Sequence, residues 1–133
     1  MSRPQLASIL WILVVAWGWV IFFASSTPAE DLAGSELFAW DKLNHFIAYA
    51  AGGWLAGSAL RVGQPDGSRR LQVFAAVVII SVYGALDELH QVYTPGRSGA
   101  DFHDWIADFL GAIAGAIMAV FTHGPLHRFV TRD

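Results

Sequence analysis

The sequence predicts an all-α fold, specifically a four-transmembrane-helix bundle with both the N-terminus and the C-terminus in the cytoplasm. Two observations predict it. Hydrophobic residues make up 55% of the 133 residues and charged residues only 14%, whereas an ordinary soluble domain is about 25% charged. The apolar residues also gather in four long segments separated by polar turns, as in membrane-spanning helices. The length suits a single membrane domain over residues 1–133.

Composition excludes several function classes. The formal net charge is −3, and a nucleic-acid-binding protein is expected to carry a basic patch instead. The chain has no cysteine, which excludes disulfides, thiol catalysis and cysteine-ligated zinc. A metal site would therefore have to use His, Asp and Glu side chains.

The first predicted helix covers residues 6–24 and contains no charged side chain. A run of about 19 residues is long enough to cross the roughly 30 Å hydrocarbon core of a bilayer. It is longer than the apolar part of a signal peptide, which is about 7–15 residues, so we expect a retained membrane helix. The polar segment from Ser25 to Trp40 is expected to be an exposed loop, with room for one short interfacial helix.

The other three helices are expected at about residues 43–60, 71–90 and 101–122. Glycine and proline separate them, because these residues interrupt helical hydrogen bonding or favour turns. The interruptions are residues 61–70, Thr94-Pro95-Gly96, and His123-Gly124-Pro125, which is expected to end the fourth helix.

The orientation follows from the lysines and arginines, which favour the cytoplasmic side in short loops. The N-terminus, the second loop and the C-terminus carry Arg3, Arg61, Arg69, Arg70, Arg128 and Arg132, whereas the first and third loops carry Lys42 and Arg97. Both termini are therefore expected in the cytoplasm. It follows that the polar residues of the second, third and fourth helices meet on the outer side.

Residue spacing predicts how the second and fourth helices pack. Every fourth residue from position 41 lies on one face of the second helix: Asp41, His45, Tyr49, Gly53 and Gly57. The fourth helix repeats the pattern with Asp101, Asp104, Asp108, Gly111 and Gly115. Paired glycines let two helix backbones approach closely in a membrane. We therefore expect the glycine stripes to pack together and the polar ends to form one outward-facing pocket.

Nine residues are predicted to bind a ligand in this pocket: Asp41, Lys42, His45, Asp87, Glu88, Gln91, Arg97, Asp104 and Asp108. Lys42 and Arg97 are the only fixed cations among them, so carboxylates are in excess. Asp108 lies one turn inside an apolar helix, where an aspartate costs up to about 2.5–3.5 kcal/mol and normally faces a polar interior. The excess acid must be protonated, solvated, or bound to a metal or a cationic ligand.

Purely structural roles are an alternative for some of these residues and their neighbours. Asp101 and Asp104 would each suit the N-cap or first turn of the fourth helix, where acids are stabilising. His90 and His103 would also suit ordinary interfacial positions.

The polar motifs also resemble those of a known family. They are Asp41-Lys42-x-x-His45, Asp87-Glu88-x-His90-Gln91, Pro95-Gly96-Arg97, and Asp104-x-x-x-Asp108-x-x-Gly111-Ala112-x-x-Gly115. Together they resemble the VanZ-like family of small bacterial integral membrane proteins, over residues 41–119. The resemblance implies a multi-pass protein of the bacterial cytoplasmic (inner) membrane. The family's founding member is linked to low-level teicoplanin resistance, and teicoplanin acts on lipid-linked peptidoglycan precursors.

Three function classes follow from these observations. In the first, the acidic and arginine-containing pocket binds a membrane lipid headgroup or a lipid-linked cell-wall precursor and so affects teicoplanin sensitivity. In the second, the chain is an intramembrane enzyme that modifies such a headgroup. Glu88, Asp108 and His45 would then be the catalytic or metal-ligating residues, and the oxygen ligands would favour Mg, Mn or Ca.

The third class is a proton- or ion-coupled transporter, which needs polar groups through the inner half of the bundle as well, and the sequence supplies few. One further enzyme class can be tested against the spacing. Membrane phosphatidic-acid-type phosphatases place an arginine, a histidine six residues later and an aspartate four residues after that. Arg97 and His103 fit the first step, but Ala107 stands at the last position, so we reject that class.

Overall fold

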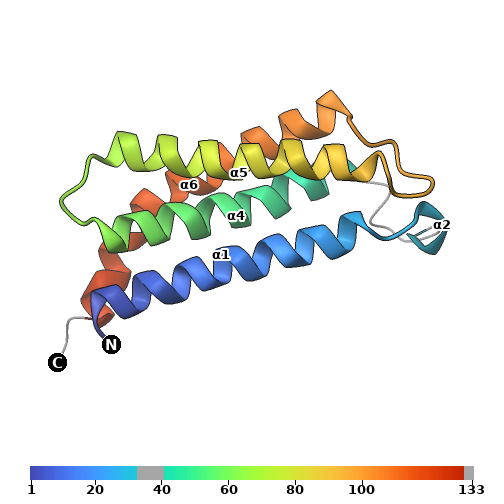
Figure 1. Ribbon diagram of the computed structural model, residues 1–133. Coiled ribbons are helices and arrows are strands. Elements are labelled where there is room, and N and C mark those ends of the chain that lie inside the picture. Colours follow the sequence, from blue (N-terminus) through green and yellow to red (C-terminus); the bar gives the residue numbers. More distant parts are fainter. Residues whose placement is uncertain (33–40, 131–133) are drawn as a thin grey trace.

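The computed structural model describes residues 1–32 and 41–130, with the side chains of residues 1–31 and 41–122. It confirms the all-α prediction. The described residues form five helices: α1 (Arg3–Ser25), α2 (Ala29–Leu32), α4 (Asp41–Gly63), α5 (Arg69–Gln91) and α6 (Phe102–Val130). The four long helices lie side by side, with α2 at one end of the molecule and the start of α1 and the end of α6 at the other (Figure 1).

Three of the described helices are long and apolar enough to cross a membrane: α1, α5 and residues 102–122 of α6. Helix α4 has the same length as α1 and α5, 23 residues, but is not among the three. It begins with Asp41 and Lys42, and its last turn carries Arg61. Helix α4 also contacts α1, α5 and α6, so much of its surface faces protein and has less need to be apolar.

The glycine stripes of α4 and α6 face each other, as predicted. A Cβ on Gly57 would lie 2.9 Å from the Cβ of Ala119, and a Cβ on Gly115 would overlap the backbone of Ala50. Real Cβ atoms do not approach other heavy atoms so closely. The backbones of α4 and α6 therefore pack in direct contact, which is the geometry that paired small residues allow in a membrane.

Helix α1 is held to its neighbours by aromatic side chains. The indole Nε1 of Trp17 donates to the backbone oxygen of Ala48 on α4, at 2.9 Å. The Trp17 ring fills the space above Gly52, where a Cβ would be only 2.6 Å away. The hydroxyl of Tyr83 on α5 donates to the backbone oxygen of Gly18. A large side chain thus separates α1 from α4, whereas small residues join α4 to α6.

The last helix is longer than predicted. Helix α6 continues to Val130, whereas the sequence pattern was expected to end it at about Thr122. Proline removes one N–H donor, and it clashes with the Cβ of the residue before it. That preceding residue is Gly124, which has no Cβ. Gly124 therefore removes one of the clashes that disfavour a helix before a proline, and α6 continues through this position.

The turn between α5 and α6 is fixed by the short helix α2, which occupies part of the predicted first loop. The rest of that loop, residues 33–40, lies outside the described residues. The backbone N–H of Ala29 donates to the oxygen of Pro95, at 3.2 Å. Gly96 has a φ of 73°, which glycine adopts without steric cost, and a Cβ there would lie 3.0 Å from that of Ala29. This contact fixes the backbone immediately before Arg97.

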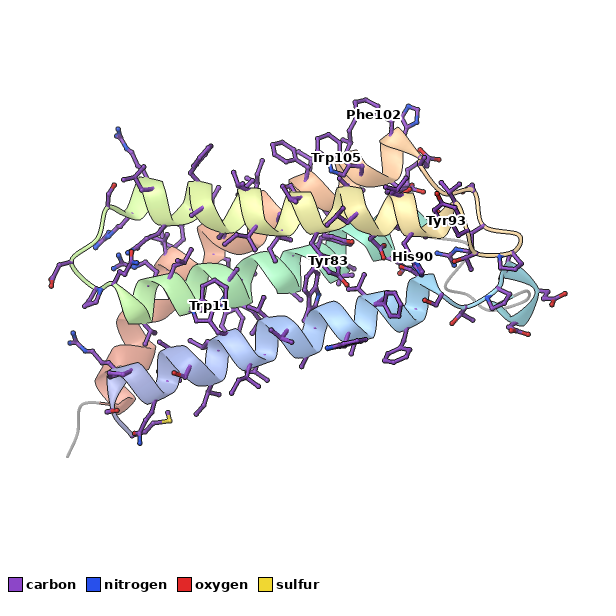
Figure 2. The ribbon with its side chains drawn as sticks, viewed as in Figure 1. Trp11, Tyr83, His90, Tyr93, Phe102 and Trp105 are labelled. Carbon is purple, nitrogen blue, oxygen red and sulfur yellow. The ribbon has the colours of Figure 1, made fainter. Side chains whose placement is uncertain are left out.

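The end of α5 also contacts the end of α1. The His90 ring lies 4.7 Å from that of Phe22, and its Nε2 is 2.9 Å from the hydroxyl of Ser26. Figure 2 shows His90 and Tyr93 at this end of the bundle, whereas Trp105 packs beside Ser81 in the middle of α5. Aromatic side chains at one end of a membrane bundle are typical of the membrane–water interface.

Candidate functional site

The structure places all nine predicted ligand-binding residues at one end of the bundle. Helices α4 and α6 begin there, and α5 ends there. Five of the nine residues are buried: Asp87, Glu88, Gln91, Asp104 and Asp108. Burying four carboxylates so close together is costly unless each is paired or hydrogen-bonded, so their partners decide what the site can do.

His45 and Asp108 connect α4 to α6. Nδ1 of His45 lies 2.8 Å from Oδ1 of Asp108, whose side chain is 0% exposed. The other ring nitrogen, Nε2, is 3.8 Å from a carboxylate oxygen of Asp41. The ring of Tyr49 is parallel to the imidazole, with their centres 6.4 Å apart. His45 is thus held in one orientation between two acids.

The second carboxylate oxygen of Asp108 has no hydrogen-bond partner among the described residues, and neither has the hydroxyl of Tyr49. Both groups lie beside Gly84 of α5. A Cβ there would be 2.9 Å from Oδ2 of Asp108 and 3.0 Å from the Tyr49 ring. A buried polar atom without a partner costs about 1–3 kcal/mol. This position is therefore suited to a proton, a cation or a ligand atom.

Asp104 pairs with Lys42. Nζ of Lys42 lies 2.6 Å from Oδ1 of Asp104, and the lysine side chain is 59% exposed while that of the aspartate is 6% exposed. The buried acid is therefore neutralised by a cation from the surface. Asp104 has a tertiary partner and is more than a first-turn acid of α6.

Gln91 connects the acids of α5 to Arg97. Its Nε2 donates to Asp87 at 3.1 Å and to Glu88 at 3.4 Å. Its Oε1 accepts hydrogen bonds from Nη2 and Nε of Arg97, at 3.0 and 3.3 Å. The Gln91 amide thus holds the guanidinium of Arg97 close to the carboxylates of Asp87 and Glu88.

Glu88 also fixes the start of α6. Its carboxylate accepts a hydrogen bond from the backbone N–H of Asp101, at 2.9 Å. Asp101 in turn accepts from the backbone N–H of His103, at 2.8 Å, which confirms the capping role predicted as an alternative. This N–H donation to its charged form lowers the pKa of Asp101 below its usual value.

A cavity of about 200 Å³ opens at this end between α1, α4 and α5; we call it the polar cavity. It is lined by five of the nine predicted residues, Asp41, His45, Asp87, Gln91 and Arg97, by Asn44, Ala48 and Tyr49, and by Ile21, Ala24, Ser25 and Thr27 at the end of α1 and just after it. The single pocket predicted from the sequence is therefore divided. The other four residues, Lys42, Glu88, Asp104 and Asp108, do not line the cavity.

The division has a steric cause. Direct backbone contact between α4 and α6 leaves no open space there, so the acids of α6 are enclosed between helices. Helix α1 is held away from α4 by the Trp17 ring, which leaves a gap at its end. The polar cavity thus forms on the α1 side of α4, and the buried acids lie on the α6 side.

With this geometry established, comparison with known proteins assigns the family. A model of the VanZ/LLP1 family matches residues 10–123, which is most of the chain. The chain belongs to the VanZ/LLP1 family. The match includes all nine predicted site residues and confirms the resemblance. This VanZ/LLP1 family member is thus a multi-pass membrane protein. No curated protein and no solved structure shows a significant match to it.

Among the described residues of this VanZ/LLP1 family member, two groups of side chains could hold a metal ion. His45, Glu88 and Asp108 form one, and Asp41, His45 and Asp104 form the other; in each, one ligand atom per residue lies within 4.8 Å of the others. The first group is the more buried and includes the Asp108 carboxylate that has the unpartnered oxygen. One imidazole and two carboxylates suit a divalent ion such as Mg, Mn or Ca.

Sequence reasoning omitted several residues that shape the site. Tyr49 lines the polar cavity, and its position four residues after His45, on the same face of α4, is the pattern that points to it. Ile21 and Ser25 line the cavity from the α1 side, but nothing in an uncharged apolar run indicates which end of it meets a polar site. Spacing places Gly84 on the same face of α5 as Asp87 or Glu88 and Gln91, but it does not show that Asp108 of α6 packs against this glycine.

Proposed function

We propose that this protein crosses the bacterial cytoplasmic membrane four times, with both termini in the cytoplasm. Helix α4 would then span the membrane in addition to α1, α5 and α6. A 23-residue helix is about 34 Å long, enough for a hydrocarbon core of about 30 Å. An even number of spans requires both termini on one side, and the start of α1 and the end of α6 lie at the same end of the bundle (Figure 1). Six of the eight lysines and arginines belong to the N-terminus, to residues 61–70 or to the C-terminus, which are the segments that this topology places in the cytoplasm.

In this orientation the polar cavity faces the outside of the cell, and its role is to bind the headgroup of a lipid-linked cell-wall precursor. The observation that carries this proposal is the mixed lining of the cavity. Arg97 is suited to a phosphate or carboxylate group, and Asp41 and Asp87 are suited to amines. Ile21 and Ala24 on the α1 side supply an apolar surface. A lipid-linked headgroup combines these features.

The orientation of Arg97 supports the same role. Its guanidinium is held by Gln91, which is itself held by Asp87 and Glu88. A side chain fixed in this way loses less conformational entropy when a ligand binds. Binding of a precursor headgroup here would change how much of it is accessible to teicoplanin, and thereby the sensitivity of the cell.

Binding to the purified full chain tests the proposal directly. A lipid-linked peptidoglycan precursor is titrated against wild-type protein in nanodiscs. Arg97→Ala should weaken binding by roughly tenfold or more, because a hydrogen bond to a charged group is worth about 1.5–3 kcal/mol. The control is His103→Ala, at the same end but outside the cavity lining. Equal affinities for all three proteins would refute the role of the cavity.

Profiling of lipids and peptidoglycan precursors in cells with and without the chain separates binding from catalysis. We expect an unchanged set of species together with altered teicoplanin sensitivity. A species that appears only with the wild-type chain, and not with Glu88→Gln, would instead favour an enzyme.

One observation favours that second candidate, a metal-dependent enzyme acting on the same headgroup. The unpartnered Oδ2 of Asp108 belongs to the group formed with His45 and Glu88. A divalent ion there would satisfy the buried oxygen. As a Lewis acid it would also polarise a phosphoryl or carbonyl oxygen of the substrate.

A further inference from the structure

A long groove runs along the outside of the bundle between α5 and α6; we call it the α5–α6 groove. Its volume is about 710 Å³, against about 200 Å³ for the polar cavity. Val73, Val77, Phe109 and Ile113 are among the apolar residues that line it. Phe74 and Val82 on its rim are more than half exposed. In a membrane protein this surface faces lipid chains and not water.

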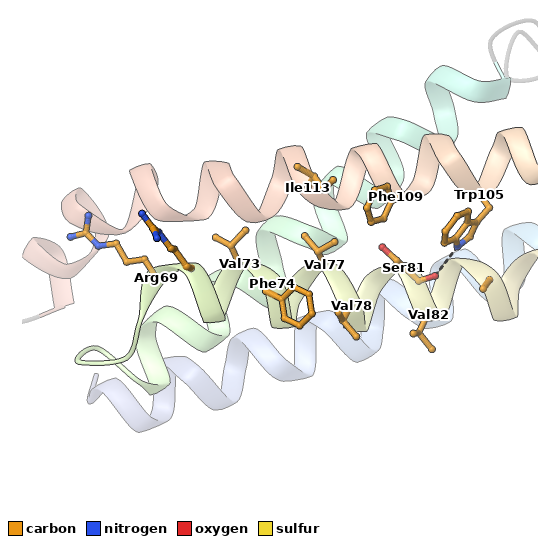
Figure 3. A pocket seen from close by; sticks show the side chains of 12 residues that line it. Arg69, Val73, Phe74, Val77, Val78, Ser81, Val82, Trp105, Phe109 and Ile113 are labelled. Carbon is orange, nitrogen blue, oxygen red and sulfur yellow. Dashed lines mark hydrogen bonds between the residues drawn. The ribbon is translucent and has the colours of Figure 1, made fainter.

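The two ends of the groove differ in chemistry. Arg69 and Arg70 line one end, and the Trp105 ring lines the other, where its Nε1 donates to the backbone oxygen of Ser81 at 3.0 Å. Figure 3 shows Arg69 and Trp105 at opposite ends, with apolar side chains between them. A groove with cations at one end and hydrocarbon along its length matches a lipid with an anionic headgroup.

The arginine end of the groove carries positive charge that no ion pair among the described residues neutralises. Arg69 is the first residue of α5, whose first turn has no acidic residue and whose N-cap, Ser68, makes no capping bond. The N-terminus of a helix carries about half a positive charge, so the helix adds to the charge of the arginines. Within the described residues, the four ion pairs involve neither Arg69 nor Arg70. An anion at this position would stabilise all three positive groups.

The length of the groove also fits. Ser81 lies twelve positions after Arg69 in α5, which is about 18 Å along the helix. One leaflet contributes about half of the roughly 30 Å hydrocarbon core. A lipid whose phosphate lies at the arginines would therefore bring the far part of its acyl chain to Trp105.

A second lipid-facing groove lies between α1 and α5 and differs from the α5–α6 groove in having no arginine among the described residues at its ends. It has a volume of about 440 Å³ and contains Trp17, Trp19 and Phe22, but no charged side chain of the described part of the chain lines it. It therefore has no means of selecting lipids by headgroup charge.

We propose that the α5–α6 groove binds an anionic phospholipid, with its phosphate at Arg69 and Arg70 and one acyl chain along the groove to Trp105. The site lies at the opposite end of the bundle from the polar cavity and does not depend on what that cavity binds. With the proposed topology, the lipid belongs to the cytoplasmic leaflet.

Quenching of tryptophan fluorescence by brominated lipid tests this proposal. The full chain is reconstituted in phosphatidylcholine vesicles, in which a small fraction of the lipid is replaced by phosphatidylglycerol or phosphatidylcholine brominated on one acyl chain. Trp105→Phe identifies the signal of Trp105 among the six tryptophans. We expect brominated phosphatidylglycerol to quench Trp105 more strongly than brominated phosphatidylcholine at equal mole fraction.

Variants at the arginine end locate the headgroup. The preference for the anionic lipid should fall roughly fivefold for each of Arg69→Gln and Arg70→Gln, the effect expected for one arginine near an anionic surface. Arg3→Gln is the matched control, since Arg3 begins α1 at the same end of the bundle, and the preference should persist. Equal quenching of Trp105 by both lipids, or a preference unchanged in Arg69→Gln/Arg70→Gln with wild-type helix content, would overturn the proposal.

Discussion

The carboxylate of Asp108 on α6 lies in the space that a side chain at position 84 of α5 would need. A Cβ on Gly84 would be 2.9 Å from Oδ2 of Asp108. The absence of a side chain at position 84 thus allows a fully buried acid to sit against the α5 backbone. The same acid is held from the other side by His45, at 2.8 Å.

Substitution of Gly84 tests this packing. We expect Gly84→Ala to destabilise the protein by about 1–3 kcal/mol, the usual cost of overpacking a buried site, because Asp108 and Tyr49 must both move. Gly18→Ala is the matched control, since a Cβ there would make ordinary contact with the Tyr83 ring at 3.5 Å. Thermal unfolding in detergent, followed by circular dichroism, measures both. Equal stability of the two variants would contradict the close packing of Asp108 and Tyr49 against Gly84.

Manganese binding tests the buried group of His45, Glu88 and Asp108. If this group holds a divalent ion, Mn²⁺ at about 100 times its dissociation constant should stabilise the folded wild-type protein by about 2.7 kcal/mol. Glu88→Gln and Asp108→Asn should abolish that stabilisation, whereas Asp31→Asn, an exposed position on α2, should retain it. The same manganese effect in all four proteins would exclude this site and with it the metal-dependent enzyme.

Cysteine labelling tests the topology, because the chain contains no cysteine. Ser98→Cys lies in the turn between α5 and α6, and Ser68→Cys precedes α5; both positions are exposed. We expect a membrane-impermeant maleimide to label Ser98→Cys in intact cells, and Ser68→Cys only after the membrane is permeabilised. The reverse labelling pattern would show that the protein has the opposite orientation in the membrane. Labelling of both cysteines in intact cells would contradict the four-span arrangement.

Acid titration tests the cap formed by Asp101, which lies just before α6. Because the His103 N–H lowers the pKa of Asp101, folding favours its charged form. The cap therefore contributes stability above the pKa of the unfolded chain, about 3.9 for an aspartate, and this contribution is lost as pH falls through the lower folded value. Asp101→Asn should lose less stability than wild type over that range. Parallel pH curves for the two proteins in thermal unfolding would contradict the cap.

Much of the fold follows from local patterns in the sequence. The lengths of the apolar runs predicted α1, α5 and α6. The four-residue spacing of acids and glycines predicted that α4 and α6 pack closely, with polar groups at one shared end. These predictions succeed because a regular helix fixes which residues share a face, whatever surrounds it.

The sequence by itself thus determined an all-α membrane protein with acids at one end and glycine-lined helices. Only the tertiary structure decided that α4 lies among the other three long helices, and that Asp108 is enclosed while Asp87 borders an open cavity. The physical reason is that spacing assigns a residue to a face but not the distance to the next helix. That distance depends on the side chains at the contact, which are glycine and alanine between α4 and α6 and the Trp17 ring between α4 and α1.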